Sequence, residues 1–170
     1  MKATPQIRQR LSRFRIAKPL AGDPEMLDRF ILALRPKEFS PGVEIVSKGE
    51  SGTEAYLLVR GTVEIVDFNL QGEPYVKAVL DQDAQVLFGE MALVTSDVRT
   101  ATVRSRTPCE CWMLRRDDFL RLGEENPRLG WATLLEIARL LAERLKRTNE
   151  DVLRLFEALV MMLEDETGTR

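Results

Sequence analysis

The chain has 170 residues, a hydrophobic fraction of 44% and a formal net charge of -2. This length suits one domain with an additional helix, and the near balance of charges argues against a dedicated polyanion binder. The sequence contains no histidine, which excludes Ser-His-Asp and Cys-His triads and most zinc and copper sites. We therefore expect a binding protein without catalytic residues or a metal, and not an enzyme.

Residues 1–22 are predicted to form a basic N-terminal arm that contains no acidic side chain before residue 23. Ile7, Leu11 and Phe14 recur at helical spacing between its arginines. We favour an arm that packs these three side chains on its own domain over a surface helix that contacts a membrane or an anionic partner. The arm lacks the apolar region of a secretory signal, and no apolar run approaches the ~18 residues of a membrane span. Cys109 and Cys111 suit reduced, buried thiols, so we expect a cytoplasmic protein.

Asp23-Pro24 predicts the start of a helix that ends before Pro36. Between Phe39 and Leu114, apolar runs separated by glycine-containing turns predict strands of an antiparallel barrel or sandwich, at 43–47, 55–60, 62–68, 75–80, 101–105 and 109–114. From Asp117 the apolar spacing is helical. The predicted domains are the arm at 1–22, a β-roll at 23–125 and C-terminal helices at 126–166.

The segment from Phe88 to Val94 interrupts the strand pattern and favours a short helix that opens with Gly89-Glu90. The first N–H groups of such a helix have no intrahelical partner and attract an anion. Arg99 follows nine residues after Glu90 and can return across the loop to offer two parallel donors to a phosphate. A carboxylate at Glu90 suits the hydroxyls of a sugar. The pair therefore predicts a ligand with a phosphate and a hydroxyl close together.

The block FGEMALVTSDVRTATV resembles the phosphate-binding cassette of cyclic nucleotide-binding domains, and Gly42, Gly49-Glu50, Gly52, Tyr56 and Gly61 resemble the glycine ladder of that family's β-roll. The resemblance covers roughly residues 25–160 and implies an α+β fold. The expected architecture is an antiparallel, jelly-roll-like β-roll with an inserted cassette helix, flanked by an N-terminal helix and long C-terminal helices.

The same resemblance implies roles for individual residues. Glu90 would accept a hydrogen bond from the ribose 2′-hydroxyl, Arg99 would pair with the cyclic phosphate, and Thr100 would add a hydroxyl contact. The implied ligand-binding set is Gly89, Glu90, Met91, Ala92, Arg99, Thr100 and Ala101, with weaker candidates for base contacts at Leu87, Thr148 and Asn149. Two departures stand out: Ala84-Gln85-Val86-Leu87 replaces a frequent Gly-Asp turn, and Val98 replaces a frequent proline before the arginine.

Residues 138–149 resemble the long dimer helix of catabolite-activator-type regulators, and Leu145, Val152 and Leu159 repeat at a spacing of seven. This spacing is consistent with a helical seam between two protomers, while a lid that packs back over the base is the alternative. Both arrangements can hold in one protein.

We expect a regulatory sensor that binds a cyclic purine nucleotide, cAMP ahead of cGMP, and that signals by repositioning its C-terminal helices. It needs no cofactor besides this ligand; its expected partners are a second copy and a downstream protein that the sequence does not identify. The chain stops at Arg170, where relatives attach a helix-turn-helix, so we expect no DNA-binding domain within it. The alternatives are a truncated DNA-binding regulator of the catabolite-activator type and a non-binding assembly module with the same fold.

Overall fold

The computed structural model describes residues 1–95 and 98–167, with side chains through residue 163. The chain packs as two compact units, Met1–Thr133 and Leu134–Arg170. Residues 1–22 therefore belong to the same unit as the strands, while the second unit begins within the last helix. Ser96 and Asp97, in the loop between Glu90 and Arg99, lie outside the described residues.

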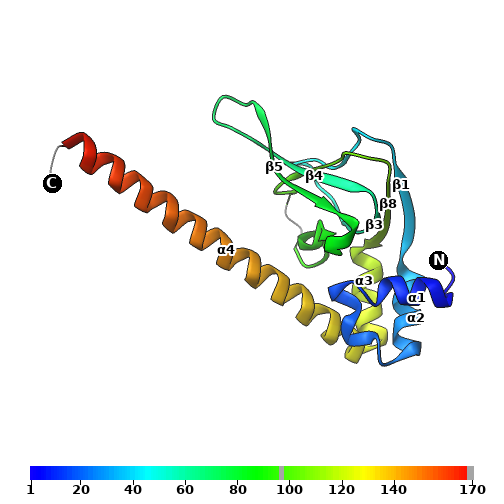
Figure 1. Cartoon of the computed structure of the whole chain (residues 1–170). Coiled ribbons are helices and arrows are strands. Elements are labelled where there is room, and N and C mark those ends of the chain that lie inside the picture. Colours follow the sequence, from blue (N-terminus) through cyan, green and yellow to red (C-terminus); the bar gives the residue numbers. More distant parts are fainter. Residues whose placement is uncertain (96–97, 168–170) are drawn as a thin grey trace. The chain divides into compact units, whose positions relative to one another are not determined.

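Two four-stranded antiparallel sheets form the body of the first unit (Figure 1). One sheet has the order β1-β8-β3-β6 and the other β2-β7-β4-β5. The strands are β1 (Arg35–Phe39), β2 (Glu44–Val46), β3 (Glu54–Arg60), β4 (Thr62–Phe68), β5 (Pro74–Asp81), β6 (Leu87–Phe88), β7 (Thr102–Ser105) and β8 (Cys109–Arg115). This architecture confirms the predicted β-roll, and six strands correspond to predicted ones. The prediction missed β1 and β6.

The side chains between the strands explain why they pack together. Val46, Leu58, Val63, Phe88 and Val103 belong to one buried cluster that draws on both sheets. Cys109 and Cys111 are free thiols within the same cluster, as expected from their position on a buried strand.

Gly61 is the single residue between β3 and β4, and it has a left-handed conformation with φ 96°. A Cβ at this position would lie 2.5 Å from the carbonyl oxygen of Pro108. The tight connection therefore requires glycine.

The helices of the first unit gather at one end of the β-roll (Figure 1). They are α1 (Pro5–Leu11), the 3-10 segment η1 (Arg15–Leu20), α2 (Pro24–Ala33) and α3 (Arg116–Glu125). Asp23 caps α2 as predicted, because its Oδ1 accepts a hydrogen bond from the N–H of Met26 at 3.1 Å.

The N-terminal arm is packed against the rest of the first unit. Leu11 and Phe14 are buried and Ile7 is half-buried, as the packed arrangement predicts. The ring of Phe14 lies 6.2 Å from that of Trp112. Arg8 donates two hydrogen bonds of 2.6 Å to the Asp28 carboxylate, and they hold the pKa of Asp28 below its usual value.

After α3 a single helix, α4 (Pro127–Thr167), runs for 41 residues, where the prediction had more than one helix. No proline or glycine follows Gly130 within it to end the helix earlier. None of the described helices contains an 18-residue stretch apolar enough to cross a bilayer.

The segment that departs from the expected Gly-Asp turn contains Gln85 in a left-handed conformation, with φ 50°. Gln85 ends the short 3-10 segment η2 (Gln82–Ala84) and leads into β6. Gln85 therefore adopts a left-handed backbone conformation that glycine adopts more readily, and this conformation costs about 1 kcal/mol of folding free energy.

Candidate functional site

The segment that follows β6 forms a compact turn beside strand β3. Phe88 of β6 pairs with Tyr56 of β3, and their rings stack with centroids 5.4 Å apart. Gly89 then reverses the chain with φ 71° and leads into η3 (Glu90–Leu93). The expected short helix is therefore a 3-10 turn of four residues, and its short length leaves little helix dipole to attract an anion.

The backbone of this turn is already partly hydrogen-bonded within itself. The N–H of Ala92 donates to the carbonyl oxygen of Gly89 at 3.1 Å, and that of Val94 donates to Met91 at 3.0 Å. The N–H groups of Ala92 and Val94 are therefore already engaged within the turn. A contribution from the backbone of Ala92 stays a prediction.

Arg99 is held at both its backbone and its side chain. Its backbone N–H donates to the carbonyl oxygen of Glu50 at 2.9 Å, and its carbonyl oxygen accepts from the N–H of Gly49 at 2.8 Å. Its guanidinium Nη1 donates to the carbonyl oxygen of Gly89 at 3.2 Å. The side chain is only 9% exposed. A buried guanidinium is costly without polar partners, and here the Gly89 carbonyl oxygen and the Glu54 carboxylate lie within reach of it.

Two glycines make room for the Arg99 guanidinium. A Cβ at Gly52 would lie 2.4 Å from both Nε and Nη2 of Arg99. A Cβ at Gly89 would lie 2.9 Å from Nη1 and 2.9 Å from the carbonyl oxygen of Glu54. The guanidinium therefore lies in a glycine-lined cradle that side chains at these positions would fill.

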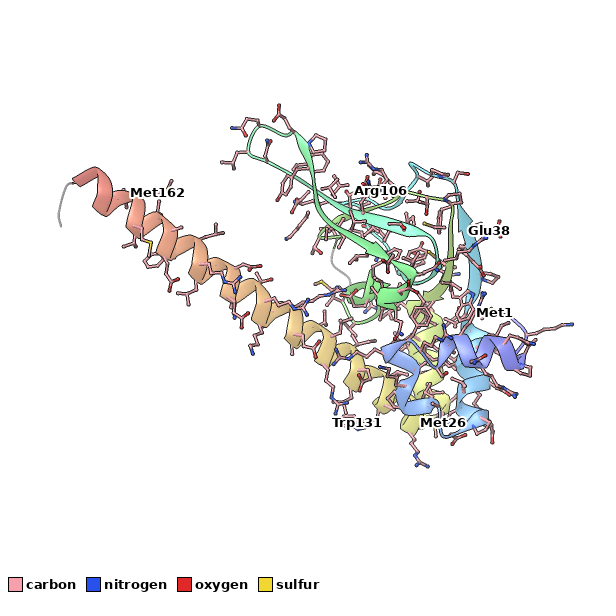
Figure 2. The ribbon with its side chains drawn as sticks, viewed as in Figure 1. Met1, Met26, Glu38, Arg106, Trp131 and Met162 are labelled. Atoms are coloured by element: carbon pink, nitrogen blue, oxygen red, sulfur yellow. The ribbon has the colours of Figure 1, made fainter. Side chains whose placement is uncertain are left out.

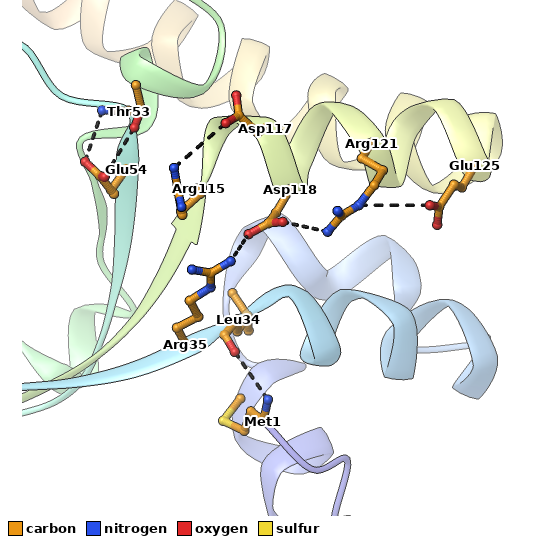
Figure 3. Close-up of polar contacts among 10 residues, drawn as sticks. All are labelled: Met1, Leu34, Arg35, Thr53, Glu54, Arg115, Asp117, Asp118, Arg121 and Glu125. Carbon is orange, nitrogen blue, oxygen red and sulfur yellow. Dashed lines mark hydrogen bonds and ion pairs between the residues drawn. The ribbon is translucent and has the colours of Figure 1, made fainter.

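Glu54, at the start of β3, is the acidic neighbour of this cradle. Its Oε2 lies 3.5 Å from Nη2 of Arg99. The same oxygen accepts from the backbone N–H of Thr53 at 3.0 Å, and Oε1 accepts from the Thr53 hydroxyl at 3.2 Å (Figure 3). Burial raises the pKa of Tyr56, the negative charge of Glu54 raises it further, and the positive charge of Arg99 lowers it.

Glu90 is buried, with 1% of its surface exposed. Glu90 has interaction partners in the structure, and among the described residues none donates a hydrogen bond to its Oε2 atom. A buried carboxylate in this position suits a neutral hydrogen-bond donor better than a second anion.

The remaining predicted residues divide between the two units. Leu87 is buried, Ala101 is half-buried, and Met91 and Thr100 are exposed in the same unit as Arg99. Thr148 and Asn149 lie on α4 in the second unit and are exposed there. Their contact with a base stays a prediction. In the part of the chain that the structure describes, no group of three or more potential acidic or thiol ligands is placed to hold a metal ion.

Gly52 and Glu54 are the residues of this cradle that the sequence reasoning did not place in the site. The sequence pattern places Gly52 only in the glycine ladder of the β-roll. The available signal was the spacing Gly49-Glu50-Ser51-Gly52-Thr53-Glu54, in which two glycines three residues apart precede an acidic residue. That spacing predicts a turn, but it does not tell which distant side chain the turn approaches.

A profile described as the cyclic nucleotide-binding domain matches residues 36–126 of this chain. The cAMP-dependent protein kinase regulatory subunit of Debaryomyces hansenii is 35% identical over 117 residues, which are 66% of this chain and 24% of that protein. The chain spans 24% or less of the length of the curated relatives it matches first.

Two solved structures extend the comparison. The catabolite activator protein of Thermus thermophilus is 28% identical with a TM-score of 0.72, over 83% of this chain and 62% of that one. The regulatory domain of Toxoplasma gondii PKA, solved with cAMP, is 27% identical with a TM-score of 0.60, over 71% of this chain and 46% of that one.

Proposed function

The chain belongs to the cyclic nucleotide-binding domain family, and from this premise we propose that it is a sensor that binds a purine 3′,5′-cyclic monophosphate through Arg99. The single observation that carries the proposal is the buried Arg99 guanidinium in its glycine-lined cradle. A guanidinium presents parallel donors that match two oxygens of a phosphate. Arg99 therefore supplies the charge and the direction of the phosphate contact.

The sugar contact is assigned to Glu90. Its buried Oε2 lies on the turn that follows Gly89, and a ribose hydroxyl is a donor without charge. Such a donor can bind a carboxylate oxygen without bringing a second negative charge to it. Together, Glu90 and Arg99 select a ligand in which a hydroxyl and a phosphate share one ribose ring. The proposal involves no catalytic step.

We assign cAMP ahead of cGMP as the ligand. The support is that a regulatory subunit named as cAMP-dependent and a regulatory domain solved with cAMP are both similar to this chain. Thr100 follows Arg99 directly and is exposed, so its hydroxyl is available to a phosphate oxygen or a purine.

The proposed output is a rearrangement of α4. The second unit is one helix that carries a stripe of apolar side chains. Leu145, Val152 and Leu159 are 62%, 60% and 54% exposed at a spacing of seven. We assign this stripe to a seam with a second copy, and the nucleotide favours whichever arrangement of α4 binds it more tightly.

The binding proposal is tested by calorimetric titration of cAMP and cGMP into the wild type and the Arg99→Ala variant. We expect the substitution to weaken cAMP binding at least about 100-fold, because two charged hydrogen bonds are lost. Arg99→Lys keeps the charge without the parallel donors and should give an intermediate loss.

Arg106→Ala is the matched control. Arg106 is an exposed arginine after β7, and Figure 2 labels it on the β-roll. This variant should bind as the wild type does. Absence of binding to the wild type, or equal binding by Arg99→Ala, would overturn the proposal.

A second candidate is the sensor region of a DNA-binding regulator, favoured by the likeness to the Thermus thermophilus catabolite activator protein. Its test is a gel-shift assay of the protein encoded by the complete reading frame, with and without cAMP. Cyclic nucleotide-dependent retention of DNA would support it.

A further inference from the structure

An acidic side chain occupies the neighbourhood of the arginine to which the phosphate contact is assigned. Glu54 Oε2 lies 3.5 Å from Nη2 of Arg99, while Nη1 of the same guanidinium donates to the Gly89 carbonyl oxygen. The Glu54 carboxylate therefore partly balances the positive charge that Arg99 offers to a phosphate. A phosphate bound to Arg99 would also lie close to the negative charge of Glu54.

Glu54 is restrained in this position from its own side. Both of its oxygens accept hydrogen bonds from Thr53, one from the backbone and one from the hydroxyl (Figure 3). The side chain is 29% exposed, so it keeps contact with solvent and does not depend on Arg99 alone. We therefore expect Glu54 to stay beside the ligand when Arg99 turns its donors to a phosphate.

We infer that Glu54 is a specificity-determining residue, which makes the site select singly charged cyclic phosphodiesters over doubly charged phosphomonoesters such as 5′-AMP. This inference rests on the proposed binding of a cyclic nucleotide through Arg99. The reason is electrostatic: repulsion by a fixed carboxylate grows with each negative charge that the ligand carries. Arg99 attracts both ligands, but the Glu54 carboxylate opposes the second charge of the monoester as well as the first.

The size of the effect follows from Coulomb's law. Two unit charges about 5 Å apart change affinity by about 4-fold at the dielectric constant of bulk water, about 80, and by more at the effective value of about 20 that is typical near a protein surface. At pH 8 a cyclic diester carries one charge, whereas a monoester carries nearly two because its second pKa is about 6. Removal of the Glu54 charge should therefore strengthen the binding of both ligands. The gain in affinity should be larger for 5′-AMP than for cAMP by the factor that one additional charge contributes.

The experiment is a competitive displacement of a fluorescent cAMP analogue at pH 8 by adenosine, cAMP and 5′-AMP, which carry about zero, one and two negative charges. The wild type is compared with Glu54→Gln, which keeps an oxygen that accepts from Thr53. A second variant, Glu54→Ala, removes the same charge together with both oxygens that accept from Thr53. Glu38→Gln is the matched control, because Glu38 is an exposed glutamate on β1 (Figure 2) whose side chain forms no ion pair with the described residues.

We expect Glu54→Gln to leave adenosine binding unchanged and to strengthen cAMP binding at least about 4-fold. It should also reduce the preference for cAMP over 5′-AMP at least about 4-fold. Glu38→Gln should change none of these values by more than about 2-fold, since a distant exposed charge is screened by salt.

The outcomes separate this inference from the function on which it rests. If the wild type binds cAMP and both Glu54 variants keep the same ratio of cAMP to 5′-AMP affinity, the role of Glu54 is refuted while the proposed function stands. If neither the wild type nor the Glu54 variants bind cAMP, both fail. A ratio that falls in the Glu54 variants and not in Glu38→Gln supports the inference.

Discussion

Replacing Gly52 by alanine would place a methyl carbon 2.4 Å from both Nε and Nη2 of Arg99. Ordinary van der Waals contact begins at 3.4 Å, so the guanidinium would have to withdraw by about 1 Å. Because the guanidinium is the far end of a flexible side chain, it can move without disturbing the strands. The expected result is a folded protein in which the Arg99 guanidinium is displaced from the position in which it would bind a phosphate.

A displacement of about 1 Å is enough to disrupt a charge-assisted hydrogen bond to phosphate, which is worth roughly 1.5–3 kcal/mol. Gly52→Ala should therefore weaken cAMP binding about 10- to 150-fold, measured by calorimetry. The free energy of unfolding, measured with urea, should stay within about 1 kcal/mol of the wild type. Alanine also reduces the freedom of the unfolded chain, and this partly offsets the strain.

The control for this prediction is Gly22→Ala, because a Cβ at Gly22 meets nothing within 4 Å and its φ is not in the left-handed region. It should bind cAMP as the wild type does. The double variant Gly52→Ala with Arg99→Ala should bind no more weakly than Arg99→Ala alone, because the methyl group acts only through Arg99. If Gly52→Ala binds cAMP within about 2-fold of the wild type, the reasoning from the cradle is refuted.

Two further predictions concern the helix seam and the buried thiols. Val152→Glu should convert a dimer into a monomer in sedimentation runs at several concentrations, since it places a charge in the apolar seam. The control is Leu153→Glu, because Leu153 is 57% exposed where Val152 is 60% exposed but lies outside the repeat of seven. This variant should leave the dimer intact. A wild type that is monomeric at every concentration, or loss of the dimer in both variants, would refute the seam. Burial raises the pKa of the Cys111 thiol from 9.0 to about 12, so between these values the folded chain binds more protons than the unfolded chain and stability falls as pH rises. Urea unfolding from pH 8 to 10.5 should show a shallower decline for Cys111→Ala than for the wild type, and parallel curves would contradict this assignment.

Short-range patterns in the sequence were sufficient for several elements. Asp23-Pro24 predicts the start of α2 because the cap and the first turn involve neighbouring residues only. The hairpin of β4 and β5 follows from two apolar runs around a turn that contains Gln71-Gly72. The turn at Gly89 and the arginine after it were likewise recognisable from residues within one short segment.

Other features depend on contacts between distant residues. Strand β1 is short, mostly exposed and contains Pro36, so nothing in its own pattern predicts a strand. It forms because it pairs with β8, where Pro36 lies opposite Trp112. A sequence pattern reports only the local preference of a segment, while the pairing of two strands depends on where the rest of the chain brings them.

The sequence by itself determined the fold class, the cassette and the candidate pair of Glu90 and Arg99, since each is expressed within a few neighbouring residues. Only the tertiary structure decided that Gly52 and Glu54 lie against Arg99, some 45 residues later in the chain. Residue types and spacing can predict that a guanidinium is present. Which glycine makes room for it, and which carboxylate competes for its charge, depends on the packing of the loop before β3 against the cassette.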